Sequence, residues 1–554
     1  MTSTIVGQNP NRIQNIVIVG GGTSGWLSAA YLSKALNKSG GTPCSITLIE
    51  SSDICTVGVG EATLPTIIYT LSEFLGIPEP DLMIECNATF KMGTKFVNWS
   101  GQPDQNVFWH PFGGEDIFWH PLRQGSLTKE LRIPISHYWL KRKLQGNPEP
   151  FDYSCFESVH LCAAKKSPKT DGNPKLRYLE YAYHLDAGLL ANYLKQKAKS
   201  EFVQHIVDNV LDVSLNDKGF ISHLITKNNG NIYGDLFIDC SGFKGLLINQ
   251  TLQEPFISYS DSLFCDNAIA IPIAYDAEDK YDTRNGGINP YTTSTALSSG
   301  WAWNTPLVGR SGNGYVYSSA FISKADAEAE FRQHLGEKSL HLEAKHIKMR
   351  VGRTRNAWVK NCISIGLSSG FIEPLESTGI YLIEAGLENL LHNFPDRLFQ
   401  PSCIANYNRI MREQYEEIRD FIVMHYCLTK REDTPFWKAN KYHPAIPESL
   451  KEKLNLWQIT WPDNPTIICR EKIAKLFPDY SYTCILAGMG YLPKHSLPIL
   501  DYYDDNEVEQ NFLAFKNHAD ALKKALPDHH EYIKQLPAKT FKFQWKQRLS
   551  SPAL

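Results

Sequence analysis

Three neighbouring residues, Glu376, Thr378 and Gly379, combine an ionisable carboxyl with a candidate anion site. They lie where a loop meets an apolar pattern of helical period, which predicts a helix from Ser377 that ends before Pro395. The first N–H groups of a helix have no partner within it, so Thr378 and Gly379 predict a site for a small anion. Ser377 is the expected N-cap, whose hydroxyl would accept a hydrogen bond from a first-turn N–H. The alternative is an ordinary loop and helix cap without chemistry.

A glycine-rich turn near the N-terminus predicts dinucleotide binding. It joins the apolar run 16–19 to a helical pattern and satisfies GxGxxG, which lets a pyrophosphate approach the start of the helix. A second apolar run, 45–49, ends at a glutamate that can hold the hydroxyls of an adenine ribose. A second glycine-rich loop, 57–65, can lie over the cofactor. The predicted cofactor residues are Gly20, Gly22, Thr23, Ser24, Gly25, Glu50 and Ala62.

Two later apolar runs, 236–239 and 362–365, are candidates for strands that close the same nucleotide-binding fold. A fold built from segments this far apart favours a bound FAD over a compact NAD domain.

Two further side chains with chemical potential stand among apolar neighbours. Lys91 is either a surface residue on a turn, the commoner case, or a desolvated amine with a chemical role. His110 lies in an aromatic cluster, where a packed core histidine is more common than a functional one. Trp301 and Trp303 alternate along a predicted strand and should share one face, with core packing as the default role.

Composition limits the classes of protein that fit. The 554 residues suit two or three lobes, and 42% hydrophobic with 21% charged residues is typical of a soluble globular protein. A net charge of −3 argues against a nucleic-acid or anionic-membrane partner. The twelve cysteines form no CxxC pair, which argues against a metal centre and favours a reduced, cytoplasmic setting. No apolar run is long enough to predict a transmembrane helix.

Four motifs together resemble the flavin-dependent halogenases of the tryptophan-halogenase family. The first is the glycine fingerprint, and the second is the segment around Lys91, which is similar to the one that bears the family's essential lysine. Trp301-x-Trp303-x-x-Pro306 matches a WxWxIP signature, with Thr305 where isoleucine is usual. The segment 371–379 matches the FxxPxxSxG signature, and the resemblance spans about residues 14–490.

The resemblance implies a reaction and its partners. Reduced FAD, supplied by a separate flavin reductase, and oxygen would oxidise chloride or bromide to hypohalous acid, which would pass through a tunnel to an aromatic substrate. Lys91 would hold the hypohalous acid or form a haloamine, and Glu376 would pair with Lys91 or accept the proton lost from the ring. Thr378 and Gly379 would bind the halide. No metal is implied, and family members are often homodimers.

The same resemblance assigns the remaining candidate residues. A substrate-side wall would be formed by His110, Pro111 and Phe112. The tunnel and signature positions would be Trp301, Trp303, Pro306 and Ser377.

The resemblance also implies an α/β fold, in which a Rossmann-like FAD-binding lobe of the flavin monooxygenase type joins a largely helical C-terminal substrate-binding lobe. The expected FAD-binding lobe comprises residues 10–125, 176–254 and 345–400. The expected substrate-binding lobe comprises residues 126–175, 255–344 and 401–554.

The C-terminal part departs from the pattern of family members that bind free tryptophan. Where those proteins carry Tyr-Tyr, Glu and Phe-Trp, this chain carries Pro465-Thr466, Lys472 and Leu476-Phe477. Because a lysine would replace the acid that holds the substrate ammonium, we expect an indole without the amino-acid end, or a larger or carrier-bound aromatic, rather than free tryptophan.

Two alternatives compete with the halogenase hypothesis. A flavin-dependent aromatic monooxygenase would share the fold but would not need Lys91 or Glu376. A flavin-binding protein without turnover would keep the motifs only for packing.

Overall fold

The computed structural model describes residues 9–37, 42–53, 60–101, 106–113, 135–170, 179–198, 202–462, 476–502 and 505–536. Within these ranges no helix is long and apolar enough to cross a membrane. The same residues contain no group of three or more His, Cys, Asp or Glu side chains placed to hold a metal ion.

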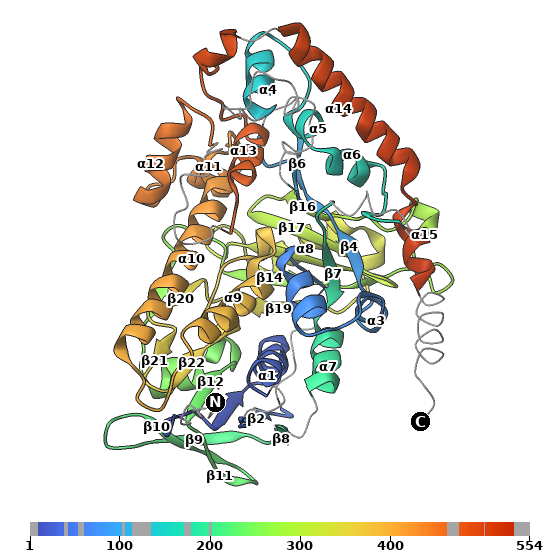
Figure 1. Cartoon of the computed structure of the whole chain (residues 1–554). Coiled ribbons are helices and arrows are strands. Elements are labelled where there is room, and N and C mark those ends of the chain that lie inside the picture. Colours follow the sequence, from blue (N-terminus) through green and yellow to red (C-terminus); the bar gives the residue numbers. More distant parts are fainter. Residues whose placement is uncertain are drawn as a thin grey trace, which may run out of the picture.

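A six-stranded sheet at one end of the molecule carries the glycine-rich turn (Figure 1). All neighbouring strands are parallel except the edge pair β21 and β22. In spatial order the strands are β21 (Trp358–Val359), β22 (Cys362–Ser364), β12 (Leu236–Asp239), β1 (Asn15–Val19), β2 (Ser45–Glu50) and β8 (Val203–Val207). The inner strands are nearly continuous apolar runs, as parallel strands covered on both faces require. The four strands expected from the sequence are therefore confirmed.

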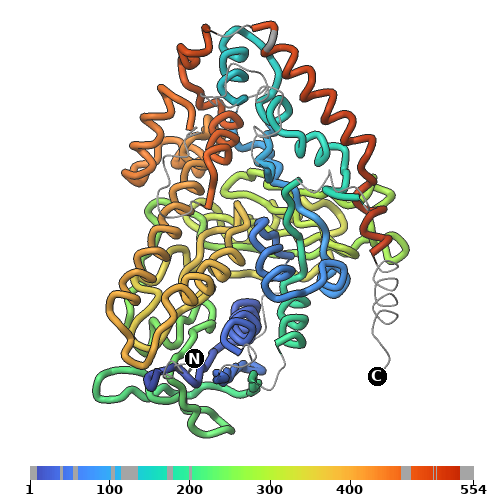
Figure 2. The backbone as a smooth tube through the Cα atoms, in the orientation of Figure 1, coloured from blue at the N-terminus to red at the C-terminus, as the bar shows by residue number. Residues whose placement is uncertain are grey.

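Segments far apart in the chain meet in this sheet. Val17 of β1 pairs with Phe237 of β12, and Ile238 pairs in turn with Ile363 of β22. Figure 2 shows the blue, green and yellow parts of the chain converging at this end. Helix α1 (Thr23–Leu36) leaves the glycine turn and packs against α7 (Ala187–Ala198) and α9 (Thr378–His392).

A larger, mostly antiparallel sheet occupies the middle of the molecule (Figure 1). Its main path is β19 (Lys345–Lys348), β14 (Asn267–Ala270), β18 (Arg310–Tyr317), β17 (Gly300–Pro306), β16 (Thr292–Ala296), β5 (Gly93–Val97) and β6 (Val107–Pro111). β15 (Ile273–Ala274) pairs with β18. Strands β5 and β6 come from the range 10–125, so this sheet crosses the expected boundary between the lobes. The division into lobes stays a prediction.

Three small sheets complete the strands. The first, β3 (Gly60–Ala62), β7 (Ala182–Asp186) and β4 (Thr89–Lys91), carries the candidate lysine. The second is a meander of β9 (Val210–Leu215), β10 (Ile221–Thr226) and β11 (Gly230–Tyr233). The third joins β13 (Phe256–Ser258), β20 (Gly352–Thr354) and β23 (Gly370–Phe371).

Helices form the narrow end of the molecule, opposite the parallel sheet (Figure 1). They are α4 (Ile135–Leu144), α5 (Phe151–Cys155), α6 (Glu157–Ala163), α12 (Glu448–Trp457), α13 (Asp479–Gly488) and α14 (Asp505–Ala525). The long helix α10 (Pro401–Cys427) runs between the two ends. Apolar positions recur at helical spacing from Ile404 to His425, so the sequence predicts a helix over 404–425, which α10 confirms. The remaining α-helices are α2 (Thr66–Ile68), α3 (Glu79–Glu85), α8 (Lys324–Leu335), α11 (Pro435–Lys441) and α15 (His529–Lys534).

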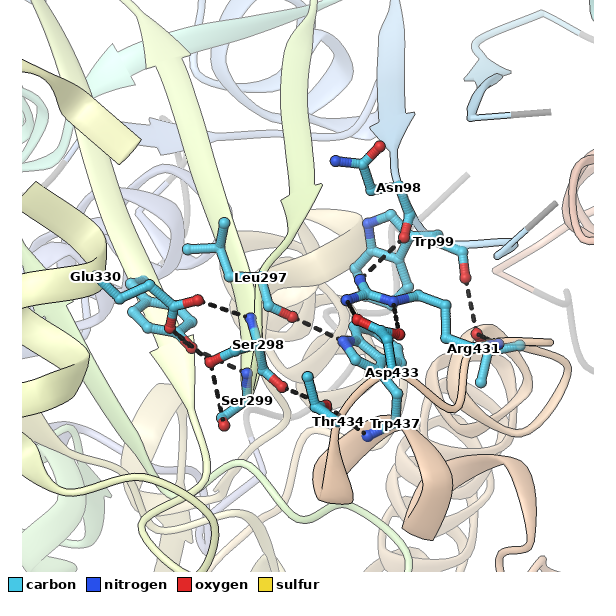
Figure 3. Close-up of polar contacts among 12 residues, drawn as sticks. Asn98, Trp99, Leu297, Ser298, Ser299, Glu330, Arg431, Asp433, Thr434 and Trp437 are labelled. Atoms are coloured by element: carbon cyan, nitrogen blue, oxygen red, sulfur yellow. Dashed lines mark hydrogen bonds and ion pairs between the residues drawn. The ribbon is translucent and has the colours of Figure 1, made fainter. Parts of the chain in front are cut away.

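The chain that follows α10 is fixed to the turn between β16 and β17 (Figure 3). The Thr434 hydroxyl donates to the carbonyl oxygen of Ser298 at 2.7 Å, and the Trp437 indole N–H donates to that of Leu297 at 2.7 Å. These bonds hold the C-terminal end of α10, including His425, against the central sheet.

Candidate active site

Lys91 ends strand β4 and is completely buried, so it is not the surface turn residue of the commoner alternative. Its Nζ donates to Ser377 Oγ at 2.7 Å, lies 3.4 Å from the carbonyl oxygen of Thr63, and stands 4.7 Å from the centre of the Phe112 ring. Burial lowers the pKa of Lys91 to about 7, although the Glu376 carboxylate acts in the opposite direction. Neutral amine and ammonium are therefore both well populated at neutral pH.

Two buried imidazoles support the strand that carries Lys91. Nε2 of His529, on the C-terminal helix α15, accepts from the backbone N–H of Phe90 at 3.1 Å, while its Nδ1 lies 2.9 Å from the carbonyl oxygen of Ile288. His184, on β7, lies 3.1 Å from the Thr89 hydroxyl. Burial lowers the pKa of both imidazoles, that of His529 to about 4, so both are neutral and serve as rigid packing. Sequence analysis identified neither.

Glu376 is held between two histidines. One carboxylate oxygen lies 2.9 Å from Nδ1 of His110, on β6, and the other lies 3.0 Å from Nε2 of His425, on α10. Burial alone would raise the pKa of Glu376, but the two imidazoles outweigh it and lower the pKa to about 2. Glu376 forms its ion pairs with these histidines and not with Lys91, so of the two roles expected for Glu376 the structure does not show the pairing with Lys91. Glu376 is instead a fixed, ionised carboxylate.

Ser377 occupies the position before α9 but does not cap it as expected. Its backbone is left-handed, with φ 61°, and its side chain makes no bond to a first-turn N–H. The hydroxyl instead accepts the hydrogen bond from Lys91. A left-handed serine is strained relative to glycine, which indicates that the surrounding fold imposes this geometry.

The start of α9 keeps the features of an anion site. The helix begins at Thr378, whose side chain is buried and whose Oγ1 has no hydrogen-bond partner among the described residues. A methyl group added at Gly379 would meet no atom within 4 Å. Open space therefore adjoins the free N–H groups of the helix N-terminus, where a small anion is favoured.

A second buried carboxyl, Glu373, lies three residues before Glu376. It accepts from the indole N–H of Trp301 at 2.8 Å and from the hydroxyl of Tyr426 at 2.5 Å. Burial raises the pKa of Glu373 to about 7, the opposite direction from Glu376. Trp301 therefore ties the central sheet to the loop before α9.

The other members of the tryptophan signature have packing contacts. The rings of Trp301 and Trp303 lie 6.2 Å apart, which confirms that they share one face of β17. Trp303 covers Gly314 of the neighbouring strand. The carbonyl oxygen of Pro306 accepts from the Thr89 hydroxyl at 2.6 Å, which connects this signature to the lysine strand.

The predicted cofactor turn has the geometry that a pyrophosphate needs. Gly20 has φ 120°, and a methyl group at Gly25 would collide with the carbonyl oxygen of Gly20. A methyl group at Gly22 would meet nothing within 4 Å, so the backbone there is open to a ligand. Thr23 and Ser24 begin α1 directly after the turn.

Glu50 and Ala62 lie on separate strands. Glu50 ends β2 and is bound by Lys195 at 2.8 Å, His205 at 2.8 Å and the Trp26 indole N–H at 3.3 Å. Burial would raise the pKa of Glu50, but the hydrogen bond and charge of Lys195, together with His205 and the Trp26 indole N–H, lower it. Ala62 ends β3, next to the residue whose carbonyl meets Lys91, while positions 54–59 of its loop lie outside the described residues.

An aromatic group lies beside the two histidines that hold Glu376. The Phe421 ring stacks on Phe477 with centres 3.9 Å apart and meets His110 edge-on at 5.8 Å and His425 at 4.9 Å. Tyr482 adds an edge contact to Phe421 at 5.0 Å.

Only some of the residues that the sequence predicted to contact the substrate lie in or beside this aromatic group. Of the expected wall, His110 binds Glu376, Pro111 ends β6, and Phe112 lies under Lys91. The tail positions Pro465, Thr466 and Lys472 lie outside the described residues.

Sequence reasoning missed His425 as a partner of Glu376. The helical pattern over 404–425 counts His425 among its apolar positions and gives it no functional role. A histidine on such a stripe needs a buried polar partner, and that requirement is the signal that was available.

Comparisons with known proteins agree with this geometry. The sequence model of the tryptophan halogenase family matches residues 15–505. The tryptophan 6-halogenase ThaL of Streptomyces albogriseolus is 40% identical over 95% of this chain and 99% of its own. The tryptophan 7-halogenase RebH of Lentzea aerocolonigenes is 39% identical over the same shares. The solved structure of BrvH, a flavin-dependent halogenase from Brevundimonas sp. BAL3, is 36% identical, with a TM-score of 0.83 over 95% of this chain and 99% of that one.

These matches decide between the hypotheses raised by the sequence. They confirm the Rossmann-like fold with a helical C-terminal lobe, and they favour a halogenase of aromatic compounds over the monooxygenase alternative. The chain belongs to the tryptophan halogenase family of flavin-dependent enzymes.

Proposed function

We propose that this enzyme uses reduced FAD, oxygen and chloride or bromide to halogenate an electron-rich aromatic compound at a centre formed by Lys91, Glu376, Thr378 and Gly379. The single observation that carries this proposal is Lys91, an amine that is completely buried and hydrogen-bonded to Ser377 beside the start of α9. A buried amine of lowered pKa next to a candidate anion site is costly to maintain without a chemical role.

The residues of the glycine turn fit FAD. Open space at Gly22 and the start of α1 suit the pyrophosphate, and the carboxylate of Glu50 suits the adenine ribose. When bound and reduced by a separate flavin reductase, the cofactor would supply the electrons that activate oxygen, and oxygen would be the oxidant that converts halide into hypohalous acid.

The start of α9 would hold the halide. The backbone N–H groups at Thr378 and Gly379 would donate to the anion, and the unpartnered Thr378 hydroxyl adds a third donor. Such hydrogen-bond donors can bind chloride or bromide, so we propose both as co-substrates.

Lys91 would deliver the halogen. As an ammonium it donates a hydrogen bond to hypohalous acid. As a neutral amine it attacks the halogen, forming an N–halogen bond and releasing water. Both forms are available because burial lowers the pKa of Lys91 to about 7. Either route keeps the electrophile next to the ring instead of in bulk water.

Glu376 would act on the aromatic ring after the halogen has added. Its pKa of about 2 keeps it ionised, so it can stabilise the positive charge on the ring and then accept the departing proton. His110 and His425 fix both of its oxygens and thereby orient the carboxylate.

For the substrate we propose indole or an indole derivative that lacks the free amino-acid end. The support is Lys472, which stands where family members that bind free tryptophan carry an acid. The stacked rings of Phe421 and Phe477 beside His110 offer a flat apolar surface that suits an aromatic ring.

The test is a mass-spectrometric assay with FAD, NADH, a generic flavin reductase and oxygen. Indole and free tryptophan are offered separately, each under chloride or bromide. We expect a product with the halogen isotope pattern on indole. The yield of this product should fall at least about 100-fold in Lys91→Met, since a nucleophile or acid–base group contributes on this scale.

The matched control is Lys95→Met, a half-buried lysine on β5 that lies against Trp109 and should retain activity. Flavin binding by Lys91→Met should also be retained. Oxygenated products without halogen would overturn the halogenase proposal. Efficient halogenation of free tryptophan would overturn only the substrate proposal.

A further inference from the structure

A small cavity lies between three helical segments away from the lysine centre. It has a volume of about 160 Å³ and is bounded by α1, by residues 66–70 and by α9. Its lining includes Tyr31, Tyr69, Tyr381, Thr66, Glu384 and Glu388. None of these residues belongs to the candidate active site, and the family signatures do not include them.

Glu384 is the unusual group in this cavity. Its side chain is only 6% exposed, and one carboxylate oxygen accepts from the Thr66 hydroxyl at 2.9 Å. The other oxygen has no hydrogen-bond partner among the described residues, and no cationic side chain is among the groups that shift the pKa of Glu384. A buried carboxylate that lacks both a counter-ion and a full set of donors costs several kcal/mol, on the order of 1–3 per missing bond.

The groups that face Glu384 are negative or neutral. Burial raises the pKa of Glu384 to about 7, and Glu388, one turn further along α9, adds to this effect. The hydroxyls of Thr66 and Thr70 act in the opposite direction. A positively charged ligand would therefore complement the charge of this cavity.

The other facing groups are aromatic hydroxyls and one further acid. They are Tyr31 on α1, Tyr69 in the π-helical turn Tyr69–Phe74, Tyr381 on α9, and Glu417 of α10, which lies near Tyr381. The pKa values of Tyr31 and Tyr381 are raised, first by burial and then by these carboxylates. None of the described residues that line the cavity is a lysine, arginine or histidine.

The aromatic lining also favours an organic cation over a metal ion. Tyrosine rings attract alkylammonium groups through their faces, and cages of several rings are a common way to bind quaternary ammonium. A hard metal ion would need six or more oxygen ligands, or a cluster of His, Cys, Asp and Glu that the described residues do not provide.

We propose that this cavity is a binding site for an alkylammonium group, with Glu384 as its counter-ion and Tyr31, Tyr69 and Tyr381 as its aromatic wall. The volume fits an ammonium group with a few methyl groups, or the end of a lysine side chain. Tyr69 lines the cavity and is 58% exposed, so a ligand would reach the site from solvent beside this residue. Glu384 lies six residues after Thr378, about 9 Å along the helix, so the site is separate from the halide site.

The test is isothermal titration of the full-length protein with tetramethylammonium, methylammonium, potassium and a short peptide that contains one lysine. We expect saturable binding of the ammonium ions and none of potassium. Binding of the small ions identifies a free metabolite-like cation as ligand, while binding of the peptide alone identifies a lysine of a protein partner. Failure of both ammonium ions and peptide, or equal binding of potassium, would overturn the proposal.

Two variants locate the binding. Glu384→Gln should weaken tetramethylammonium binding at least about 10-fold, whereas Glu85→Gln, an exposed acid at the end of α3, should leave it unchanged. Tyr381→Leu should weaken tetramethylammonium binding more than methylammonium binding, because methylammonium can also donate N–H hydrogen bonds to Glu384, whereas tetramethylammonium relies more on the ring faces. The melting temperature of each variant verifies that it is folded. Undiminished binding in both Glu384→Gln and Tyr381→Leu would place the ion elsewhere.

Measuring the affinity for tetramethylammonium at several pH values tests the role of Glu384 independently of its effect on folding. Because the carboxyl must ionise to bind a cation, affinity should rise between pH 6 and 8, and binding at pH 7 should release protons that change the measured heat between buffers. Glu384→Gln should abolish both effects. A pH-independent affinity would contradict the role of Glu384. Since binding and not turnover is measured, the outcome is independent of the proposed halogenation.

Discussion

The ammonium of Lys91 donates a hydrogen bond to the hydroxyl of Ser377 over 2.7 Å, although 286 positions separate the two residues in the chain. This bond joins the short lysine strand β4 to the start of α9. It explains why Ser377 does not cap its own helix, since its backbone is left-handed and its hydroxyl is directed to Lys91. The amine, the candidate anion site and the Glu376 carboxylate are thereby held in one rigid group.

Ser377 can be tested with a pair of substitutions that separate its hydroxyl from its backbone. Ser377→Ala and Ser377→Gly both remove the acceptor of Lys91, so we expect both to lower turnover at least about 10-fold, given a cost of 1–3 kcal/mol for a buried donor without a partner. The glycine variant should be more stable than the alanine variant by about 1 kcal/mol, because glycine adopts φ 61° without strain. Urea unfolding and product yield measure the two effects. A fully active glycine variant would show that turnover depends on the left-handed backbone at position 377 and not on the Ser377 hydroxyl.

Glu373 and Glu376 should respond to pH in opposite ways. Burial raises the pKa of Glu373 from 4.5 to about 7, so the folded protein binds more protons than the unfolded chain between these values, and stability falls as pH rises through this window. The imidazoles overcome burial and lower the pKa of Glu376 to about 2, so its contribution is full above pH 4.5 and is lost as pH falls towards 2.

The measurement compares Glu373→Gln and Glu376→Gln by urea unfolding between about pH 2.5 and 7, a range that covers both windows. Relative to the unmodified protein, Glu373→Gln should gain stability as pH rises from 4.5 to 7, by up to about 1.4 kcal/mol per pH unit. Glu376→Gln should be less stable above pH 4.5, and this deficit should shrink at lower pH. If the two variants shift in parallel, the opposite electrostatic environments assigned to the two carboxyls are incorrect.

Gly379→Ala tests the anion site without disturbing the helix. A methyl group there meets no protein atom, and alanine favours a helix over glycine by about 1 kcal/mol, so stability should be unchanged or higher. The methyl group would occupy the space of the halide, so the KM for bromide should rise at least about 10-fold. Gly386→Ala is the matched control, since it adds the same methyl to the same helix at ordinary contact distance, 3.4 Å from the Tyr407 hydroxyl. An unchanged bromide KM in Gly379→Ala would refute the site.

The local elements of this protein follow from the sequence because short-range physics determines them. The apolar runs that became β1, β2, β12 and β22 are covered on both faces, and the glycine turn needs backbone angles and contacts that only glycine allows. The apolar period after Ser377 predicted α9, and the amphipathic period predicted α10. The identity of Lys91 as a candidate likewise came from one charged residue among apolar neighbours.

The partners of these residues were decided only by the tertiary structure. Glu376 meets His110 from 266 positions away and His425 from 49 positions away, and neither spacing corresponds to a period of helix or strand. The expected contact of Glu376 with Lys91 failed because two imidazoles satisfy both carboxylate oxygens, which leaves the ammonium to Ser377. Hydrogen bonds between buried groups depend on how distant strands and helices pack. The sequence by itself therefore indicated Lys91, Glu376, Thr378 and Gly379 as candidates, and the packing decided their partners, among them His425, and their charge.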